Sequence, residues 1–188
     1  MITDPVPRSG VRRAEYGRSD ARRTVTLPSD DRLHALALEV ESALSSGSTA
    51  AVRMACAAFL TEAAQFYRVP EPKVCVLAAR PLRVYERGSA ELFGDYDLRT
   101  MLIRVWMRTA VQRRVTSFGT LLSTLCHEFC HHLDLHLLGF SSTPHTRGFY
   151  QRTAVLYHHC RATPLRPLVW RDIGRGLWQV DWSRMTGA

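Results

Sequence analysis

The chain has 188 residues, of which 46% are hydrophobic and 22% are charged, so it can form one globular domain with a core and leaves little room for two. Its 25 basic residues exceed its 17 acidic residues, and Lys73 is the only lysine, so arginine carries the net charge of +8. Arginine suits phosphate and carboxylate partners. Because the excess is not gathered into one run, we interpret it as a diffuse basic surface, with a nucleic-acid partner as the alternative.

The five cysteines are scattered through apolar segments and form no C-x-x-C pair. This pattern argues against a disulfide framework and against a zinc ribbon, and it is typical of a reducing compartment. No apolar segment follows the basic start, and none reaches the length of a membrane span. We therefore predict a cytoplasmic protein that has neither a signal peptide nor a membrane helix.

The first 28 residues differ in composition from the rest of the chain. They are polar and rich in arginine, and prolines and glycines interrupt any periodicity. This composition predicts a mobile basic tail over residues 1–28, in front of a single domain over residues 29–188. A tail that contacts nucleic acid is the alternative interpretation.

Two segments with apolar residues at helical spacing open the domain, over residues 33–44 and 52–67. A serine, threonine or aspartate precedes each of them as a candidate cap, and Pro70 follows the second. Neither helix carries a candidate site residue. We expect both to be scaffold.

After Pro72 the hydrophobic period changes from helical to alternating. Short runs separated by turn residues predict three or four strands, over residues 73–79, 83–86, 92–96 and 99–108. In the last run Ile103 and Val105 alternate with Arg104, which suits either a strand near a sheet edge, where an extended peptide could add, or a plain half-buried strand. We predict an α+β fold, with a small mixed or antiparallel sheet of three to four strands packed on helices.

The region between Leu98 and His127 contains no acidic residue. It contains five arginines, namely Arg99, Arg104, Arg108, Arg113 and Arg114. If these arginines share a face with a functional site, that site is electropositive.

An apolar helical stripe around residues 118–138 carries the motif His127-Glu-Phe-Cys-His131. At about 100° per residue the two histidines lie one turn apart on one face, so both imidazoles can bind one metal ion. Glu128 lies beside that face, where its carboxylate can act on a water molecule without being a ligand. The alternative is a solvated helix in which the pattern occurs by chance.

A catalytic zinc site normally has three protein ligands and one open position. We assign the third ligand to His145, because it follows a loop that can turn the chain back and it stands at the start of the next helix. His136 is the nearest rival, but it lies nine positions after His127 on the same helix and is displaced along the axis. Leu137 stands where the extended H-E-x-x-H signature needs a ligand, and no glutamate occurs later in the chain.

Three elements together resemble the SprT-like zinc metallopeptidases: the motif at 127–131, the strand segment at 103–106, and the sequence His145-x-x-x-Phe149. The resemblance covers roughly residues 73–160. It implies a compact zincin fold, the three histidines as zinc ligands, the motif glutamate as general base, and a link to DNA-associated protein processing. The chain departs from the family pattern because it has no C-terminal four-cysteine ribbon and has Arg-Gly where the family often has Pro-Glu.

The preferred hypothesis is a zinc-dependent endopeptidase acting on a protein or peptide. Zinc held by His127, His131 and His145 activates a water molecule, and Glu128 takes the proton as a peptide carbonyl is attacked. Asp134 either orients an imidazole or is an ordinary solvated carboxylate. The candidates to stabilise the oxyanion are Tyr150, Tyr157, Arg147 and His132.

Two further hypotheses come from other classes. The first is a basic nucleic-acid-associated protein with a structural zinc ion or none, whose affinity falls steeply with salt. The second is a zincin-fold binding protein without catalysis. The presence of Glu128 counts against the second, because a structural metal site has no need of it.

Overall fold

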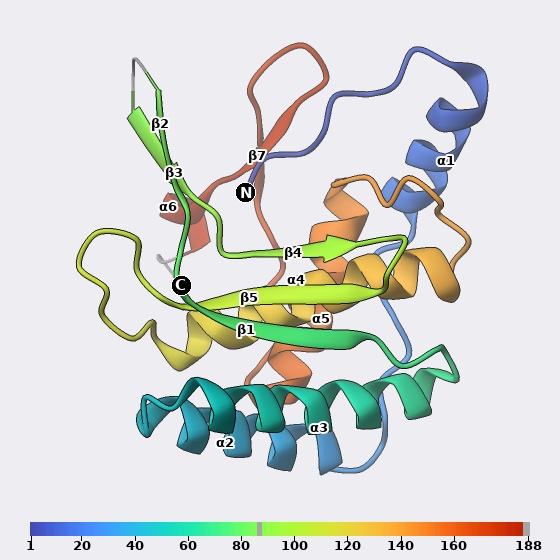
Figure 1. Cartoon of the computed structure of the whole chain (residues 1–188). Coiled ribbons are helices and arrows are strands. Elements are labelled where there is room, and N and C mark those ends of the chain that lie inside the picture. Colours follow the sequence, from blue (N-terminus) through green and yellow to red (C-terminus); the bar gives the residue numbers. More distant parts are fainter. Residues whose placement is uncertain (86–87, 186–188) are drawn as a thin grey trace.

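The computed structural model describes residues 1–85 and 88–185. Its main sheet has three strands in the order β1-β5-β4, which are Lys73–Ala79, Leu102–Arg108 and Gly94–Asp97. Strand β5 pairs parallel with β1, with Val76 opposite Val105, and antiparallel with β4, with Tyr96 opposite Ile103. The sheet is therefore mixed, and β4 forms the edge that lies next to helix α4 (Figure 1).

The last predicted strand is central rather than close to an edge, so that interpretation was wrong. Ile103, Val105 and Met107 are fully buried against the helices, whereas Arg104 points to the other face and pairs with Asp95. The alternation was read correctly, but it arises because one face of β5 is fully buried against the helices whereas the other carries the partly exposed Arg104. Alternation carries no information about which strands lie on the two sides.

Two small hairpins accompany the sheet. Strands β2, Leu82–Tyr85, and β3, Gly88–Glu91, form one of them. The end of the predicted strand 83–86 lies outside the described residues. Strands β6, Trp170–Asp172, and β7, Trp178–Val180, form the other hairpin.

Six helices occur in the described part of the chain, and four of them form the core with the sheet. Helix α3, Thr49–Tyr67, packs along β1 and is backed by α2, Arg32–Ser45. Helix α4, Phe118–His136, packs against β4 and β5, and α5, Arg147–Cys160, packs against α4 (Figure 1). The remaining two are α1, Gly10–Ala21, and the short α6, Trp182–Met185. Helices packed on a small mixed sheet agree with the predicted α+β class.

The segment 1–28 differs from the tail that we predicted. It contains α1, which packs on α5 and buries Glu15, Tyr16 and Ser19. Before α1 the chain runs beside β7, where the Thr3 N–H donates to the Trp178 carbonyl at 2.9 Å. Hydropathy did not reveal this packing because α1 is held mainly by polar side chains rather than by an apolar stripe. Within the described residues, no helix is long and apolar enough to cross a membrane.

Candidate metal centre

Helix α4 carries the motif, and its start and its buried side follow from the local sequence. The Ser117 side chain caps the helix by accepting a hydrogen bond from the Thr120 N–H at 3.2 Å. Leu121, Leu125 and Phe129 are each at most 1% exposed, and they pack the helix onto the core. Because this face is held so firmly, the positions of the two motif histidines are set by helix geometry.

The structure brings His127, His131 and His145 together, as the sequence predicted. Their Nε2 atoms form a triangle with sides of 3.1 Å from His127 to His145, 3.2 Å from His127 to His131, and 3.1 Å from His131 to His145. The first two histidines come from α4, and His145 comes from the loop that precedes α5. These three residues lie close enough to bind one metal ion.

Hydrogen bonds alone cannot satisfy this triangle. Each nitrogen of a neutral imidazole is either a donor or an acceptor, so at least one of the three contacts joins two atoms of the same kind. A cation in contact with three lone pairs removes the conflict. Nitrogen ligands of a tetrahedral ion at about 2.0–2.1 Å lie about 3.3–3.4 Å apart, close to the observed separations. The donor set therefore fits a metal ion.

The burial of the two motif histidines favours the neutral form that a metal requires. Burial, and then the neighbouring His145, lower the pKa of His127 to about 3. Burial and the two other imidazoles lower the pKa of His131 well below its ordinary value. Both rings are therefore uncharged at neutral pH and each keeps a lone pair.

Phe149 forms the apolar wall behind the three imidazoles. Its fully buried ring stacks on His131, with 4.4 Å between centroids, and meets His127 and His145 edge-on at 4.9 and 5.1 Å. Tyr150 stacks on His145 at 5.6 Å. The motif His145-x-x-x-Phe149 thus has a physical basis, because one turn of α5 places the phenyl ring against the ligand that precedes the helix.

Glu128 is 5% exposed and lines the same cleft as His127. Burial is the main cause that raises the pKa of Glu128 to about 8, and the negative charge of Asp95 adds to the effect. A nearby cation acts in the opposite direction because it favours the charged carboxylate. A buried carboxylate with a raised pKa accepts a proton more readily than a solvated one.

Gly94 allows β4 to lie directly against Glu128, a feature that sequence reasoning missed. A Cβ atom at this position would lie 2.5 Å from Thr124 Cγ2 and 2.9 Å from Glu128 Oε1. Any side chain here would push the strand or the carboxylate away. A glycine within the predicted strand 92–96 was the available signal, since such glycines often mark a close approach.

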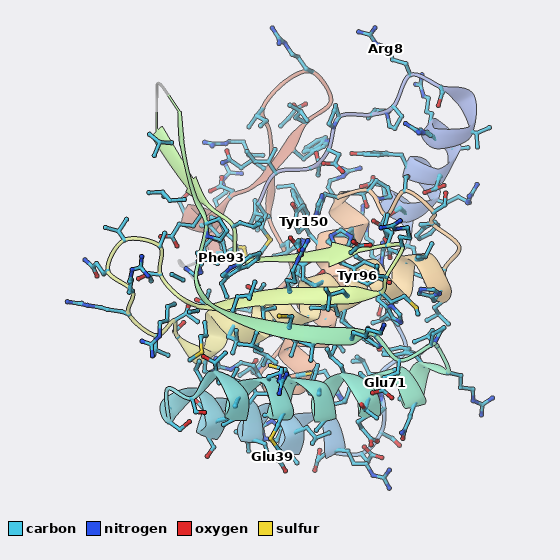
Figure 2. The ribbon with its side chains drawn as sticks, in the orientation of Figure 1. Arg8, Glu39, Glu71, Phe93, Tyr96 and Tyr150 are labelled. Carbon is cyan, nitrogen blue, oxygen red and sulfur yellow. The ribbon has the colours of Figure 1, made fainter. Side chains whose placement is uncertain are left out.

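A cleft of about 820 Å³ opens beside His127 and Glu128. Figure 2 labels two of its lining residues, Phe93 from the connection before β4 and Tyr150 from α5. Its rim is held by buried Arg80, which donates to Glu91 at 2.9 Å and stacks over the Phe93 ring at 3.9 Å. The cleft is large enough for several residues of an extended peptide.

The rival histidines lie outside the triangle. His132 is buried, and its Nε2 donates to the Pro70 carbonyl at 2.8 Å, so its Nδ1 accepts from the Tyr96 hydroxyl at 2.8 Å. His132 is thereby committed to the scaffold and is not an oxyanion donor. The His136 Nε2 atom lies 3.5 Å from the same hydroxyl, so His136 is not a ligand.

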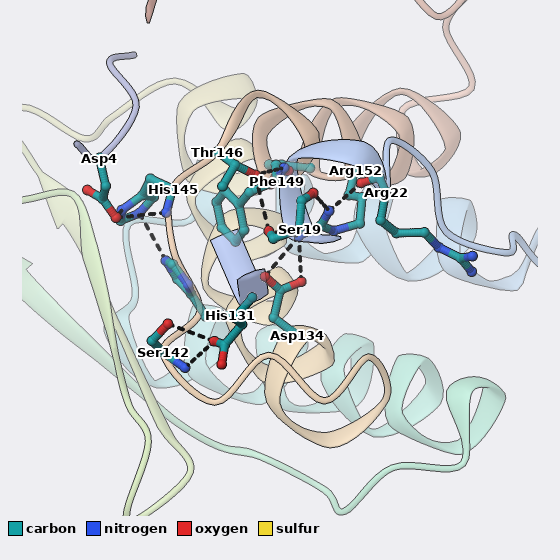
Figure 3. A network of polar contacts seen from close by, with 12 residues as sticks. Asp4, Ser19, Arg22, His131, Asp134, Ser142, His145, Thr146, Phe149 and Arg152 are labelled. Carbon is teal, nitrogen blue, oxygen red and sulfur yellow. Dashed lines mark hydrogen bonds and ion pairs between the residues drawn. The ribbon is translucent and has the colours of Figure 1, made fainter. Parts of the chain in front are cut away.

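Asp134 has neither of the two roles predicted for it. It is fully buried and receives both of its hydrogen bonds from Arg152, at 2.8 and 2.9 Å (Figure 3). Arg152 is also buried and donates to the carbonyls of Ser19 and Arg22 at the end of α1. The pair therefore joins α4, α5 and the N-terminal segment. Sequence reasoning could not pair Asp134 with an arginine on another helix.

The other predicted oxyanion candidates have different surroundings. Arg147 forms an ion pair with Asp20 and lies 4.6 Å from the Trp178 ring, so its charge is already engaged. The Tyr150 hydroxyl donates to the Ile2 carbonyl at 2.9 Å. Tyr157 lines the cleft, and its hydroxyl accepts a long contact of 3.4 Å from Arg161. Of the four candidates, Tyr157 is the best placed to donate into the cleft.

The arginines of the segment 99–114 do not make the cleft electropositive. None of them is among its described lining residues, which include Glu91 and Glu128. Arg104 pairs with Asp95 at 2.6 Å, and Arg108 donates to the Arg113 carbonyl at 3.2 Å. The geometry of the cleft therefore lends no support to a nucleic-acid site there.

Comparisons of the chain with models of protein families, with curated proteins and with solved structures gave no match. The resemblance to the SprT-like metallopeptidases accordingly stays a prediction from the three sequence elements.

Proposed function

We propose that this protein is a zinc-dependent endopeptidase with a zincin-like active site. The observation that carries the proposal is the arrangement of three converging imidazole nitrogens, one of which, on His127, lines an open cleft together with the buried Glu128. The glutamate distinguishes this arrangement from a purely structural metal site. It is the residue type that hydrolytic zinc sites use next to the ligands.

Zinc is the ion that this donor set suits best. Three neutral imidazoles without a thiolate or a carboxylate ligand are typical of zinc sites that keep a fourth position open. In such a site zinc supplies a Lewis acid that makes water a nucleophile near neutral pH. The cleft at His127 gives that fourth position access to solvent and substrate.

Glu128 is the proposed general base. One of its carboxylate oxygens accepts the proton of the attacking water, and the burial that raises its pKa to about 8 strengthens it as an acceptor. Gly94 lets the β4 backbone pack against this carboxylate and limits its movement. Tyr157, which lines the same cleft, is the proposed donor to the oxyanion of the peptide carbonyl.

The edge of β4 is the proposed docking line for the substrate backbone. Among the described strands β4 pairs with β5 alone, so its outer N–H and C=O groups are available to an extended peptide. The edge runs beside α4, which carries His127 and Glu128. This placement differs from the sequence-based suggestion in that the peptide adds to β4 rather than to β5.

The test combines metal analysis with a variant that spares the ligands. We expect one zinc ion per chain in the wild type and weakened binding in His145→Ala. We expect Glu128→Gln to keep the zinc ion but to lose about 10²–10⁴-fold in hydrolysis of an unfolded, fluorescently labelled protein, because the proton acceptor is gone. Glu71→Gln is the matched control, since Glu71 is exposed and hydrogen-bonds Thr61 away from the cleft (Figure 2).

Two outcomes would overturn the proposal. Full activity in Glu128→Gln would remove the general base, and a wild-type protein that binds no zinc would remove the metal. Activity in the wild type that survives complete chelation of the metal would have the same effect as the second outcome.

A further inference from the structure

We propose that Asp4 is a positioning residue of the metal centre, and that the N-terminal segment 1–22 holds the third ligand in place. The Asp4 Oδ2 atom accepts the backbone N–H of His145 at 2.8 Å and lies 3.5 Å from its Nδ1 atom (Figure 3). The Asp4 N–H donates in return to the His145 carbonyl at 2.8 Å. One residue of this segment thus contacts the main chain and the ring of a proposed ligand.

His145 needs such a partner because it lies outside a helix. His127 and His131 are fixed by α4, whereas His145 belongs to the loop between α4 and α5. A ring on a loop can turn, and either of its nitrogens can carry the proton. Ligating histidines usually have the second nitrogen bonded to a carboxylate, a carbonyl or a water, which fixes both the ring and the tautomer.

The chemistry of the contact favours the tautomer that binds metal. A carboxylate near Nδ1 stabilises a proton on that nitrogen, which leaves the Nε2 lone pair free. Nε2 is the atom of His145 that lies 3.1 Å from both of the other Nε2 atoms. Asp4 therefore acts on the nitrogen that does not face the metal position.

Asp4 itself is held on both sides. On one side, Thr3 is bonded to Trp178 of β7 through its N–H and through its hydroxyl, at 2.9 and 3.0 Å. On the other side, the hydroxyl of Tyr16, on α1, donates to the Asp4 carbonyl at 3.1 Å. The main chain on both sides of the Asp4 carboxylate is thus held by the β6–β7 hairpin and by α1.

A second acidic residue of the same segment holds the start of the ligand loop. Glu15, 6% exposed, accepts from the N–H and the hydroxyl of Ser142, both at 2.7 Å, and from the hydroxyl of Ser141 at 3.1 Å. Ser19 and Thr146 meet at 3.1 Å just after the ligand. The loop that carries His145 is therefore held before, at and after the histidine by residues 4–19.

The experiment compares metal affinity and ring tautomer between variants. Zinc affinity is measured by competition with a chromophoric chelator, and the His145 tautomer by long-range ¹H–¹⁵N NMR of the metal-free protein. We expect Asp4→Ala to weaken zinc binding about 10-fold to 100-fold and to reduce the population with Nδ1 protonated. Asp31→Ala is the matched control, because Asp31 is exposed and makes no side-chain cap hydrogen bond at α2.

A thermal melt shows whether Asp4→Ala folds, and a second variant keeps the test decisive if it does not. Asp4→Asn keeps an oxygen that can accept the His145 N–H but removes the charge beside Nδ1, so we expect an intermediate loss of about 3-fold to 10-fold. If Asp4→Ala folds, a zinc affinity and a His145 tautomer equal to those of the wild type would overturn the inference. If Asp4→Ala does not fold, the same result in Asp4→Asn would overturn it.

The inference rests on the metal ion of the proposed function, but the two can fail separately. If the wild type binds no zinc, the proposed function fails. If the wild type binds zinc and the folded Asp4 variants bind it equally well, only the role of Asp4 fails. Neither result depends on an assay of hydrolysis.

Discussion

The two sides of the metal centre are built in different ways. His127, Glu128 and His131 are positioned by one helix, whose cap and apolar stripe lie within a few residues of them. His145 is positioned by residues that are distant in sequence, since its main chain bonds to Asp4 and its loop bonds to Glu15. We call His127, Glu128 and His131 the helical side, which local periodicity positions, and His145 with its loop the loop side, which tertiary contacts position. The two sides should therefore respond differently to substitution.

The largest effect is expected at Arg152, which joins the two sides. Arg152→Met leaves the Asp134 carboxylate buried without its partner, so we expect a loss of about 3–5 kcal/mol in the free energy of unfolding, measured in urea. The double variant Arg152→Met with Asp134→Leu removes both charges and should recover part of the loss. A single variant within about 1 kcal/mol of the wild type would contradict a structural role for the pair.

A smaller effect is expected where α1 meets α5. A Cβ at Gly148 would fall within 2.1 Å of the Ser19 carbonyl and 2.6 Å of the Asp20 carbonyl. We expect Gly148→Ala to displace α1, to destabilise the fold by about 1–3 kcal/mol, and to weaken zinc binding by loosening the loop side. Gly17→Ala is the matched control within α1, because its Cβ meets nothing within 4 Å, and it should stabilise by about 0.5–1 kcal/mol. Equal effects of the two substitutions would argue against the close contact.

On the helical side the corresponding glycine should affect the reaction rather than the metal. Gly94→Ala crowds Thr124 and Glu128, so we expect about 10-fold to 100-fold lower activity as the carboxylate moves. Zinc affinity should stay within about twofold of the wild type, because the three atoms nearest to a Cβ at this position belong to Thr124 and Glu128 and not to the histidines. If Gly94→Ala instead loses zinc but keeps its activity per bound zinc ion, then Gly94 supports the metal ligands rather than Glu128.

The smallest effect is expected in the dependence of stability on pH. Burial alone would raise the pKa of Glu15 and of Asp20, but the hydrogen bonds from Ser142 and from Arg147 hold both below their ordinary values. A carboxyl whose pKa is depressed by folding stabilises the protein above its unfolded pKa, and this contribution is lost as the pH falls through the folded value. Unfolding measured between about pH 3 and pH 6 should therefore show stability falling on acidification below about pH 5. Glu15→Gln should make the fall in stability shallower, whereas the control Glu39→Gln, at an exposed position of α2, should not. An unchanged slope of stability against pH in Glu15→Gln would exclude Glu15 as a contributor.

The sequence predicted the helical side of the site because the relevant physics is local. The apolar stripe and the spacing of His127 and His131 are both read within about twenty residues, and the structure agrees with each. The choice of His145, made because it follows a loop that can turn the chain back, was also confirmed, since the structure brings this residue together with His127 and His131. The general class of helices on a small mixed sheet followed from the change of period after Pro72.

The remaining features depend on contacts that no short window contains. The pairing of Asp134 with Arg152, and of Asp4 with His145, joins residues on separate elements, so hydropathy and spacing did not reveal them. The central place of β5 depends on which strands pair with it rather than on its own pattern. Helix α1 was missed because buried polar contacts hold it, and these look like a solvated segment in the sequence.

The contacts of the N-terminal segment have a consequence for the order in which the protein is made and folded. The bonds from Asp4 to His145 and from Glu15 to Ser142 span 141 and 127 residues, so they are among the most non-local in the chain. Residues 1–22 leave the ribosome long before the loop that they hold. Such closures carry a large entropic cost and form late in folding. Helix α4, with His127 and His131, can therefore form before His145 is fixed, and the three imidazoles come together only when the N-terminal segment has closed on the loop.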